Sequence, residues 1–337
     1  MVINNFMKRP TLKMIASEMD LSVCAVSKIV NGKGKSIGLN DNTIKKTLVF
    51  ADKVGYRPHK QAQNLRLGKT NTIGVILCMP EPNNSDMSYK LFKGISQTAR
   101  KSSQALMFFD IDDTDSALSA INQCLNSGVD GIIATHLDDP VYLERLRELI
   151  SQGINVVTVL NRSGSILDCP NVEVDHQKGG SIATEYLIKK GYKRIAHLAS
   201  RFVPGVGEEH FQGYKKALEV TGIEYDEKLV VQDTEDINFT GAKNLLKLKE
   251  LPDAVFCWND RSAVKTQHIF ANAGVKIKIV GFDNREFIQY MKEPFDSVDF
   301  PLQEVGKTAV NTLLSGDLSK RILTISPELV IYPKNRN

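Results

Sequence analysis

The sequence contains little cysteine and no long apolar run. Its five cysteines are odd in number, scattered along the chain and never spaced as Cys-x-x-Cys, which argues against a disulfide framework and against a zinc site. The first 13 residues contain no apolar stretch of signal-peptide length, and no later segment approaches the length of a membrane span. We therefore expect reduced thiols and a cytoplasmic protein without a membrane segment.

The short motifs of the common enzyme classes are also missing. We find no nucleophile elbow and no cluster of His and Cys at metal-ligand spacing. The stretch GKGKS at residues 32–36 is similar to the end of a phosphate-binding loop, but Ile29 stands where that loop requires glycine, and no strand precedes it. These absences predict a protein that is not an enzyme and that carries no cofactor or metal.

Charge is distributed unevenly along the 337 residues. Residues 1–69 contain 13 Lys and Arg against 4 Asp and Glu, whereas the rest contains 30 against 35, so a head of net charge +9 precedes a body of −5. The length and the 42% hydrophobic content favour two or three domains with sizeable cores. A basic head on a mildly acidic body predicts a polyanionic partner for the head alone.

Two short helices joined by a tight turn are predicted at the start of the head. Thr11 and Ser22 are their expected N-caps, and only about two residues, Asp20 and Leu21, separate them. The expected buried side of the second helix consists of Ala25, Val26, Ile29 and Val30, and the opposite side consists of Val23, Cys24, Ser27 and Lys28. Slim side chains around one cation can approach a polyanion closely. The pair is typical of a helix-turn-helix, although a helical hairpin with a solvated face fits these residues equally well.

A third helix and a hinge are predicted next. Asn40 is the expected N-cap of a helix that ends at Gly55 and whose buried face would carry Ile44, Leu48, Ala51 and Val54. Residues 58–67 are few and mostly polar, so a helix there is unstable on its own in water. We expect a hinge that becomes ordered only when a partner holds it.

The body alternates apolar strands with amphipathic helices from Thr72 onward, which predicts two doubly wound α/β lobes. Ligands of such sheets bind at the carboxyl ends of the strands. Polar residues gather at several of these ends, although each alone is more often a helix cap or a loop residue than a ligand contact. They are Asp110, Asp112, His136, Asn161, Arg162, Asp175, Arg201, Asn259, Asp260, Asp283 and Asn284.

Residues 11–30, together with GYRP at 55–58 and AQNLRLGKTNTIGVI at 62–76, resemble the lactose-repressor (LacI) family of bacterial transcription regulators. The resemblance continues in family order through VDGII, GYKRIAHL, IVGFDN and PELVIYP and covers nearly the whole chain. It implies an all-α helix-turn-helix head plus an α/β two-lobed, periplasmic-binding-protein-like effector domain. The implied domains are a head at 9–57, a hinge helix and linker at 58–70, and a core for effector binding and dimerisation at 71–337. The first lobe would span about 71–170 with 300–318, and the second about 171–299 with 319–333.

The resemblance also implies roles for residues of the head. The first, second and sixth residues of the second helix read base edges in the family, and here they are Val23, Cys24 and Lys28. Family positions that bind phosphates carry Thr11, Ser22, Ser27 and Asn31 here. Leu65 matches the hinge leucine that wedges into the minor groove; without the resemblance it reads as a leucine packed on its partner hinge. A hydroxyl or amide is usual where Cys24 and Ala25 stand, so the operator sequence does not follow from the family.

In the effector domain the resemblance points to Asn259 in WND and Asp283 in GFDN, which match positions that hydrogen-bond the effector in sugar-responsive members. His210 stands where the family usually has an arginine, whose guanidinium fork a histidine cannot reproduce. The usual Asn-Pro-aromatic motif after the first strand is replaced by PEPNNSDMSY. Trp258 and Phe300 are candidates for stacking on a sugar ring, although an aromatic residue at a strand end is more often part of the core.

The predicted function is that of a homodimeric, sequence-specific DNA-binding transcriptional regulator, a repressor, whose lobes respond to a small-molecule effector such as a sugar or a related metabolite. Its DNA partner would be a double-stranded, pseudo-palindromic operator. The alternative is a solute-binding protein of a transport system, because the same two-lobed fold serves that role. The basic head and the lack of a signal peptide argue against this alternative.

Overall fold

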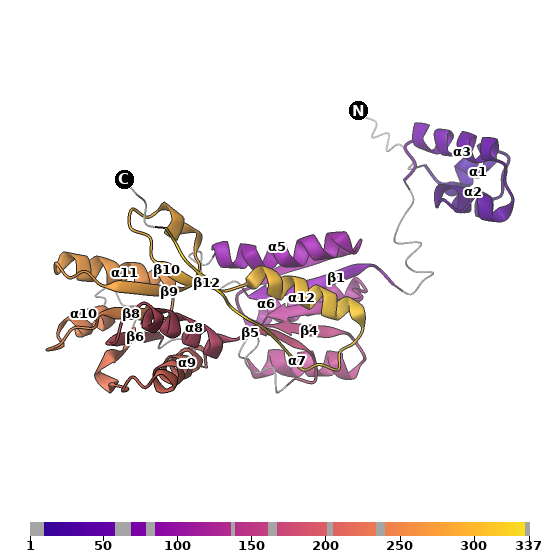
Figure 1. Cartoon of the computed structure of the whole chain (residues 1–337). Helices are drawn as coiled ribbons and strands as arrows, with labels where there is room; N and C mark the ends of the chain where they lie inside the picture. The colour runs from indigo at the N-terminus through magenta and orange to yellow at the C-terminus, as the bar shows by residue number, and fades with distance from the viewer. Residues whose placement is uncertain are drawn as a thin grey trace, which may run out of the picture. The chain divides into compact units, whose positions relative to one another are not determined.

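The computed structural model describes residues 10–57, 69–78, 85–135, 139–160, 167–200, 205–233 and 240–333 (Figure 1). The chain forms two compact units, Met1–Thr70 and Asn71–Asn337. The first unit contains the basic head, and the second contains two α/β lobes. Each unit has a hydrophobic core of its own.

The head is formed by α1 (Leu12–Glu18), α2 (Val23–Val30), a short 3-10 turn η1 (Lys35–Ile37) and α3 (Asp41–Lys53). The predicted N-caps are confirmed, because Thr11, Ser22 and Asn40 each accept a hydrogen bond from the backbone N–H three residues on. Asp20, in the turn between α1 and α2, has a φ of 51°, a left-handed conformation that Asp adopts more readily than most residues. The predicted tight turn is therefore present.

The core of the head draws residues from all three helices. Its buried members are Ile15, Ala16, Val26, Ala51 and Tyr56. The prediction that Leu48 lies on the buried face of α3 is wrong, since Leu48 is 44% exposed. Thr47 is buried instead, and its hydroxyl donates to the backbone oxygen of Thr43 at 2.8 Å. The buried Thr47 hydroxyl thus has a hydrogen-bond partner in the preceding turn of its own helix.

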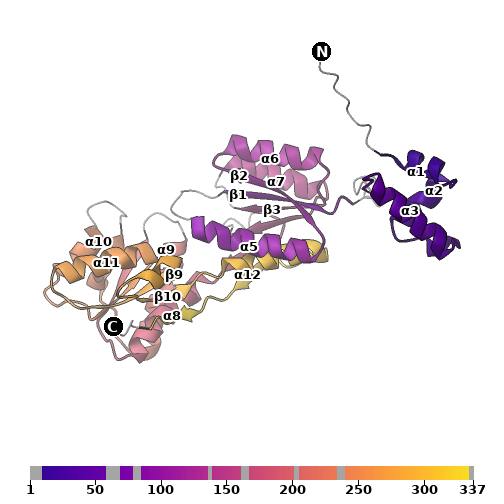
Figure 2. The same ribbon diagram turned by 90° about the horizontal axis from the view of Figure 1, so that it is seen from above.

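The first lobe is built on a six-stranded sheet of order β11-β5-β4-β3-β1-β2, whose pairings are all parallel. Its strands are β1 (Thr72–Cys78), β2 (Ala105–Ile111), β3 (Gly131–Thr135), β4 (Val156–Val159), β5 (Asn171–Val174) and β11 (Ile322–Ile325). One face is covered by α5 (Ser85–Lys101) and α12 (Leu302–Ser315), and the other by α6 (Thr114–Asn126) and α7 (Pro140–Ser151) (Figure 2). Alternate side chains of β1 enter the two cores, Val75 on the α5 side and Ile76 on the α6 side.

The second lobe repeats this plan with the order β12-β10-β9-β8-β6-β7, where only the pairing of β10 with β12 is antiparallel among the described strands. Its strands are β6 (Ile195–Ser200), β7 (Val230–Asp233), β8 (Ala254–Cys257), β9 (Lys278–Asp283), β10 (Asp296–Asp299) and β12 (Leu329–Val330). Its helices are α8 (His176–Lys189) and α9 (Val206–Thr221) on one face and α10 (Thr240–Leu246) and α11 (Asp260–Asn272) on the other. The described part of this lobe also contains the 3-10 turns η3 (Glu227–Leu229) and η4 (Glu286–Tyr290).

The chain passes between the two sheets at places that differ from the predicted lobe boundaries. Strand β5 pairs with β4 and β11 in the first sheet, so the first crossing falls after Val174 and not at residue 171. Strand β11 also lies in the first sheet, so the last crossing falls after Ile325 and not at residue 319. The alternation of strands and helices predicts the strands from β1 to β9, but not β10, β11 and β12 and not the sheet that a strand joins. Strand pairing is decided by residues far apart in the sequence.

Candidate nucleic-acid interface and effector site

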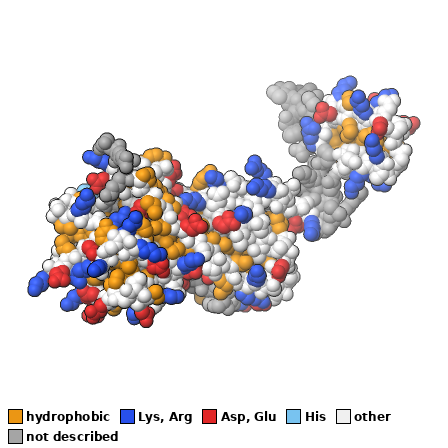
Figure 3. Space-filling model, viewed as in Figure 1, with side chains coloured by type: hydrophobic (Ala, Val, Ile, Leu, Met, Phe, Trp, Pro, Cys, Tyr) orange, Lys and Arg blue, Asp and Glu red, His pale blue; other side chains and the backbone are white. Residues whose placement is uncertain are grey.

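The exposed side of α2 carries the predicted base-reading residues. Val23 is 41% exposed, Cys24 and Lys28 are also exposed, and Ser27 is half-buried. Val26 and Ile29, on the opposite side, are buried against α1 and α3. The helix contains no carboxylate, so Lys28 is its only charged residue. Figure 3 shows further Lys and Arg side chains over the visible face of the head.

Two predicted phosphate contacts, Thr11 and Ser22, are also helix caps. The Thr11 hydroxyl accepts from the backbone N–H of Met14 at 3.2 Å, and the Ser22 hydroxyl accepts from that of Ala25 at 3.1 Å. Both side chains are exposed. A capping hydroxyl uses its oxygen as acceptor and keeps its proton to donate, so the same group can cap a helix and bind a phosphate oxygen. Asn31 is the C-cap residue of α2.

The hinge leucine lies outside the described residues. Leu65 falls between residue 57, where the description of the head ends, and residue 69, where that of the body begins. Its assignment as a minor-groove wedge stays a prediction.

The predicted effector residues Trp258 and Asn259 lie where β8 meets α11. Asn259 is 7% exposed and caps α11, with its side-chain oxygen accepting from the backbone N–H of Ser262 at 2.7 Å. The Trp258 indole donates to a carboxylate oxygen of Asp233 at 3.4 Å, and the Ser262 hydroxyl donates to the same oxygen. Asn259 therefore caps a helix, and the Trp258 indole is held by a polar contact at the end of β8.

Asp283 ends β9 in an unusual backbone conformation. Its φ is 100°, and Asn284 after it has a φ of 50°. These are left-handed values that cost energy for residues other than glycine, and such strain is concentrated at functional sites. Burial and the neighbouring carboxylate of Asp260 raise the pKa of Asp283 well above its usual range. Among the residues that the structure describes, no hydrogen bond to the Asp283 carboxylate is found, and the helix-cap role that competes with ligand binding has no support there.

Asp260 is one of the polar strand-end residues of the sequence, but the family resemblance did not assign it to the effector. It is fully buried as the first residue of α11. Its two carboxylate oxygens accept from the backbone N–H of Arg285 at 2.7 Å and from the Ser297 hydroxyl at 2.6 Å. Burial raises the pKa of Asp260 to about 7. Asp260 thus fixes the start of the segment that follows Asp283.

Two side chains of α5 connect the first lobe to this same segment of the second. The Arg285 guanidinium binds Asp86 through two contacts, Nε to Oδ2 at 2.7 Å and Nη2 to Oδ1 at 2.5 Å. Lys90 Nζ donates to the backbone oxygens of Asn284 at 2.9 Å and Asp283 at 3.4 Å, and it lies 3.6 Å from the Asp299 carboxylate. Sequence reasoning missed these contacts, because the partners are almost 200 residues apart.

His210 lies inside the second lobe, 1% exposed, against His176 at the start of α8. Nδ1 of His176 and Nε2 of His210 are 3.1 Å apart. Helices α8 and α9 approach closely here, since a Cβ on Gly180 would lie 2.3 Å from the backbone oxygen of His210. Phe300 packs on the His176 ring at a centroid distance of 5.3 Å. Phe300 and His210 therefore belong to one aromatic cluster near the crossings between the lobes.

Within the described residues no group of three or more His, Cys, Asp or Glu side chains is placed to hold a metal ion. None of the helices in the described part of the chain is both long and apolar enough to cross a membrane.

Comparison with known proteins identifies relatives of both units. Residues 70–315 match the family described as periplasmic binding proteins and sugar binding domain of the LacI family. The chain is 30% identical to catabolite control protein A of Priestia megaterium over 337 residues, covering 96% of each chain. It is 27% identical to the HTH-type transcriptional repressor PurR of Vibrio atlanticus (strain LGP32), covering 95% of this chain and 97% of that one.

Solved structures share the fold of the whole chain. The lac repressor dimer bound to operator and the anti-inducer ONPF superposes with a TM-score of 0.76 at 19% identity, over 96% of this chain and 98% of that one. The complex of the transcriptional regulator CelR with cellobiose gives a TM-score of 0.63 at 22% identity, over 96% and 99%. With the helix-turn-helix head, the two parallel sheets and the matched family profile, this chain belongs to the LacI family.

Proposed function

We propose that this protein is a sequence-specific DNA-binding transcriptional repressor, active as a homodimer and controlled by a small-molecule effector. The structure of the head is the main support for this proposal. The head contains a capped helix-turn-helix whose second helix exposes Val23, Cys24 and Lys28 and contains no carboxylate. The relatives catabolite control protein A and PurR are regulators of this kind, and the solved structures include a repressor on its operator and a regulator with a sugar.

The residues of α2 divide by their chemistry into two kinds of DNA contact. Lys28 can donate to the acceptors of a guanine in the major groove, whereas Val23 and Cys24 offer apolar contact of the kind that fits a thymine methyl group. The hydroxyls of Thr11 and Ser22, together with Ser27 and Asn31, bind phosphates and position the head without specifying sequence. Leu65 inserts into the minor groove between the two half-sites, as its family position implies.

We assign the effector site to the strand ends that carry Asp283, Asn259, Trp258 and Phe300, and to His210 of α9. A carboxylate that accepts hydrogen bonds from hydroxyl groups suits a sugar or a related metabolite. The segment from Asp283 to Arg285 is also the one that the first lobe contacts through α5. A ligand on Asp283 therefore changes the balance between two arrangements of the lobes, and β1, which follows the hinge in the chain, carries that change to the DNA-binding unit.

The experiment is a selection of bound sequences from random double-stranded DNA with the full-length protein. We expect enrichment of one site made of two related half-sites in inverted order. Its affinity should fall with salt at a slope of about −0.9 per phosphate neutralised, in plots of log affinity against log salt.

Two charge-reversal variants at exposed lysines are selected in parallel, one in the proposed interface and one on the body as its control. Lys28→Glu should abolish the enrichment, while Lys101→Glu, on α5 of the body, should leave it unchanged. Absence of any enriched sequence, or an enriched site without inverted symmetry, would contradict the proposal.

A further inference from the structure

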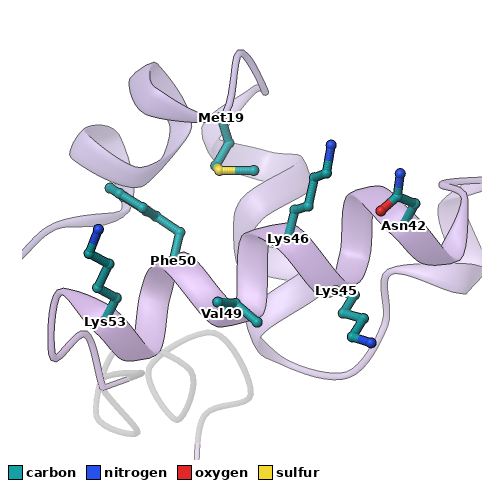
Figure 4. A pocket seen from close by; sticks show the side chains of 7 residues that line it. All are labelled: Met19, Asn42, Lys45, Lys46, Val49, Phe50 and Lys53. Carbon is teal, nitrogen blue, oxygen red and sulfur yellow. The ribbon is translucent and has the colours of Figure 1, made fainter.

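A groove on the head lies between α3 and the end of α1 and has a volume of about 520 Å³. Its lining consists of Met19, Asn42, Lys45, Lys46, Val49, Phe50 and Lys53, and we call it the lysine-rimmed groove. In Figure 4 the Met19 side chain reaches over α3 next to Phe50, and the three lysines project from α3 around this apolar floor. No lining residue comes from α2, so the groove is separate from the proposed base-reading surface.

The floor of the groove exposes apolar side chains that the head itself does not cover. Val49 is 61% exposed, and its neighbour Leu48, which misses the core, is 44% exposed. Met19 and Phe50 are half-buried. Adjacent exposed apolar residues rimmed by polar ones are a feature of protein interaction sites.

The rim of the groove carries positive charge that the head does not neutralise. Residues 1–70 contain four carboxylates in all. Asp41 pairs with Lys35 and Asp52 with Arg57. The other two, Glu18 and Asp20, flank Met19, and within residues 10–57 neither forms an ion pair with a rim lysine. An occupant of the groove must therefore bring negative charge with it.

Three kinds of occupant can be compared with these observations. The phosphate backbone of DNA satisfies lysines but offers no apolar surface to cover Val49 and Met19. The head of a second copy brings the same three lysines and is repelled. We propose that the lysine-rimmed groove binds an acidic amphipathic helix of a partner protein, whose apolar stripe covers Val49 and whose carboxylates pair with Lys45, Lys46 and Lys53. Since α2 takes no part, the partner helix and DNA bind together.

The test uses full-length protein and a fluorescein-labelled peptide of 18 residues, with Leu at positions i, i+3, i+4 and i+7 and Glu at most others, followed by fluorescence anisotropy. The control peptide has the same composition in an order that leaves no apolar face. We expect the amphipathic peptide to bind at least about tenfold more tightly than its control, because only it presents both apolar and acidic groups to the groove.

Substitutions at exposed residues test the apolar floor and the lysine rim of the groove separately. Val49→Ser and, separately, Lys45→Glu with Lys53→Glu should each weaken peptide binding about tenfold. The matched controls lie on the body: Val220→Ser, at a valine that is 78% exposed on α9, and Lys101→Glu with Lys276→Glu. These should bind the peptide as the parent does. A lysine-rich version of the amphipathic peptide should bind the Lys45→Glu, Lys53→Glu variant better than the parent.

A competition experiment with DNA tests whether the groove lysines are phosphate contacts instead. A 30-base-pair duplex added at saturation should leave the bound peptide in place. Displacement of the peptide by the duplex, with no effect of Val49→Ser, would show that the lysines are phosphate contacts and would overturn the proposal. Equal binding of the amphipathic and control peptides would overturn it as well.

Discussion

The ion pair between Asp86 and Arg285 should hold the two lobes together. Replacing Asp86 should lower the free energy of unfolding more than replacing Arg285. The Arg285 side chain is 6% exposed, whereas that of Asp86 is 24% exposed. Burial alone would raise the pKa of Asp86, but the hydrogen bond and the charge of Arg285 outweigh burial and hold that pKa below its usual range. The carboxylate is therefore ionised at neutral pH and pairs fully with the guanidinium.

The expected losses in the free energy of unfolding differ because the two side chains differ in exposure. Two opposite charges about 4 Å apart attract by about 4 kcal/mol at an effective dielectric constant of about 20, and desolvation offsets part of that gain. Asp86→Asn leaves a nearly buried guanidinium without its carboxylate, so we expect a loss of about 3 kcal/mol in the free energy of unfolding. Arg285→Met leaves a carboxylate that water can reach, so the loss should be smaller, about 1 to 2 kcal/mol.

The assay is urea unfolding of the full-length protein at pH 7, followed by tryptophan fluorescence. The chain contains a single tryptophan, Trp258 in the second lobe, so the signal reports the unit in which the ion pair lies. The double variant should lose about 1 to 2 kcal/mol less than the sum of the single losses, which is the coupling of the pair. Arg145→Met, which breaks an exposed pair with Glu148 on α7, is the matched control and should cost under about 1 kcal/mol. Additive losses below about 0.5 kcal/mol for both the Asp86 and the Arg285 variants would show that this ion pair does not hold the lobes together.

Three further predictions concern the effector site, a buried carboxylate and the hinge. Asp283→Ala should abolish the thermal shift that a sugar or related metabolite gives the parent in a ligand screen; a variant that melts lower yet keeps the full shift would remove Asp283 from the site. The pKa of Asp260 is raised to about 7, so its contribution to stability is present below about pH 4 and is lost as the pH rises through 7. The free energy of unfolding of the parent minus that of Asp260→Asn should therefore decrease from pH 5 to pH 8, and an unchanged difference would contradict the burial argument. Leu65→Ala should remove operator bending in permuted-site gel mobility and most of the specific affinity, with non-specific binding little changed; a variant that bends the operator as the parent does would show that Leu65 only packs between hinges.

Local features of this chain could be predicted from the sequence because they depend on few residues. The caps Thr11, Ser22 and Asn40 were predicted from side chains that satisfy the N–H groups at a helix start. The tight turn at Asp20 was predicted from the short connection between the two helices. The strands from β1 to β9 follow from apolar runs that alternate with amphipathic helices, whereas β10, β11 and β12 were not predicted.

Features that depend on distant residues could not be predicted in the same way. The apolar residues of α3 are compatible with two choices of buried face. The packing of α3 against α1 and α2 decides that Thr47 and not Leu48 faces inward. The contacts of Asp86 and Lys90 with the second lobe depend on how two lobes meet. The pairing of His176 with His210 had one available signal, the glycines Gly180 and Gly213, which allow α8 and α9 to approach to backbone contact.

If α2 reads DNA bases through its exposed side, Lys28→Ala should weaken binding to the operator more than binding to random DNA. Affinities of parent and variant are measured by anisotropy at one salt concentration, on the selected operator and on a duplex of random sequence. We expect the variant to lose about 1 to 3 kcal/mol of binding free energy on the operator and little on random DNA, because a base contact specifies sequence whereas phosphate contacts do not. Lys60→Ala, at a hinge cation, should weaken both duplexes alike. Equal losses on operator and random DNA for Lys28→Ala would show that Lys28 contacts phosphate and not a base.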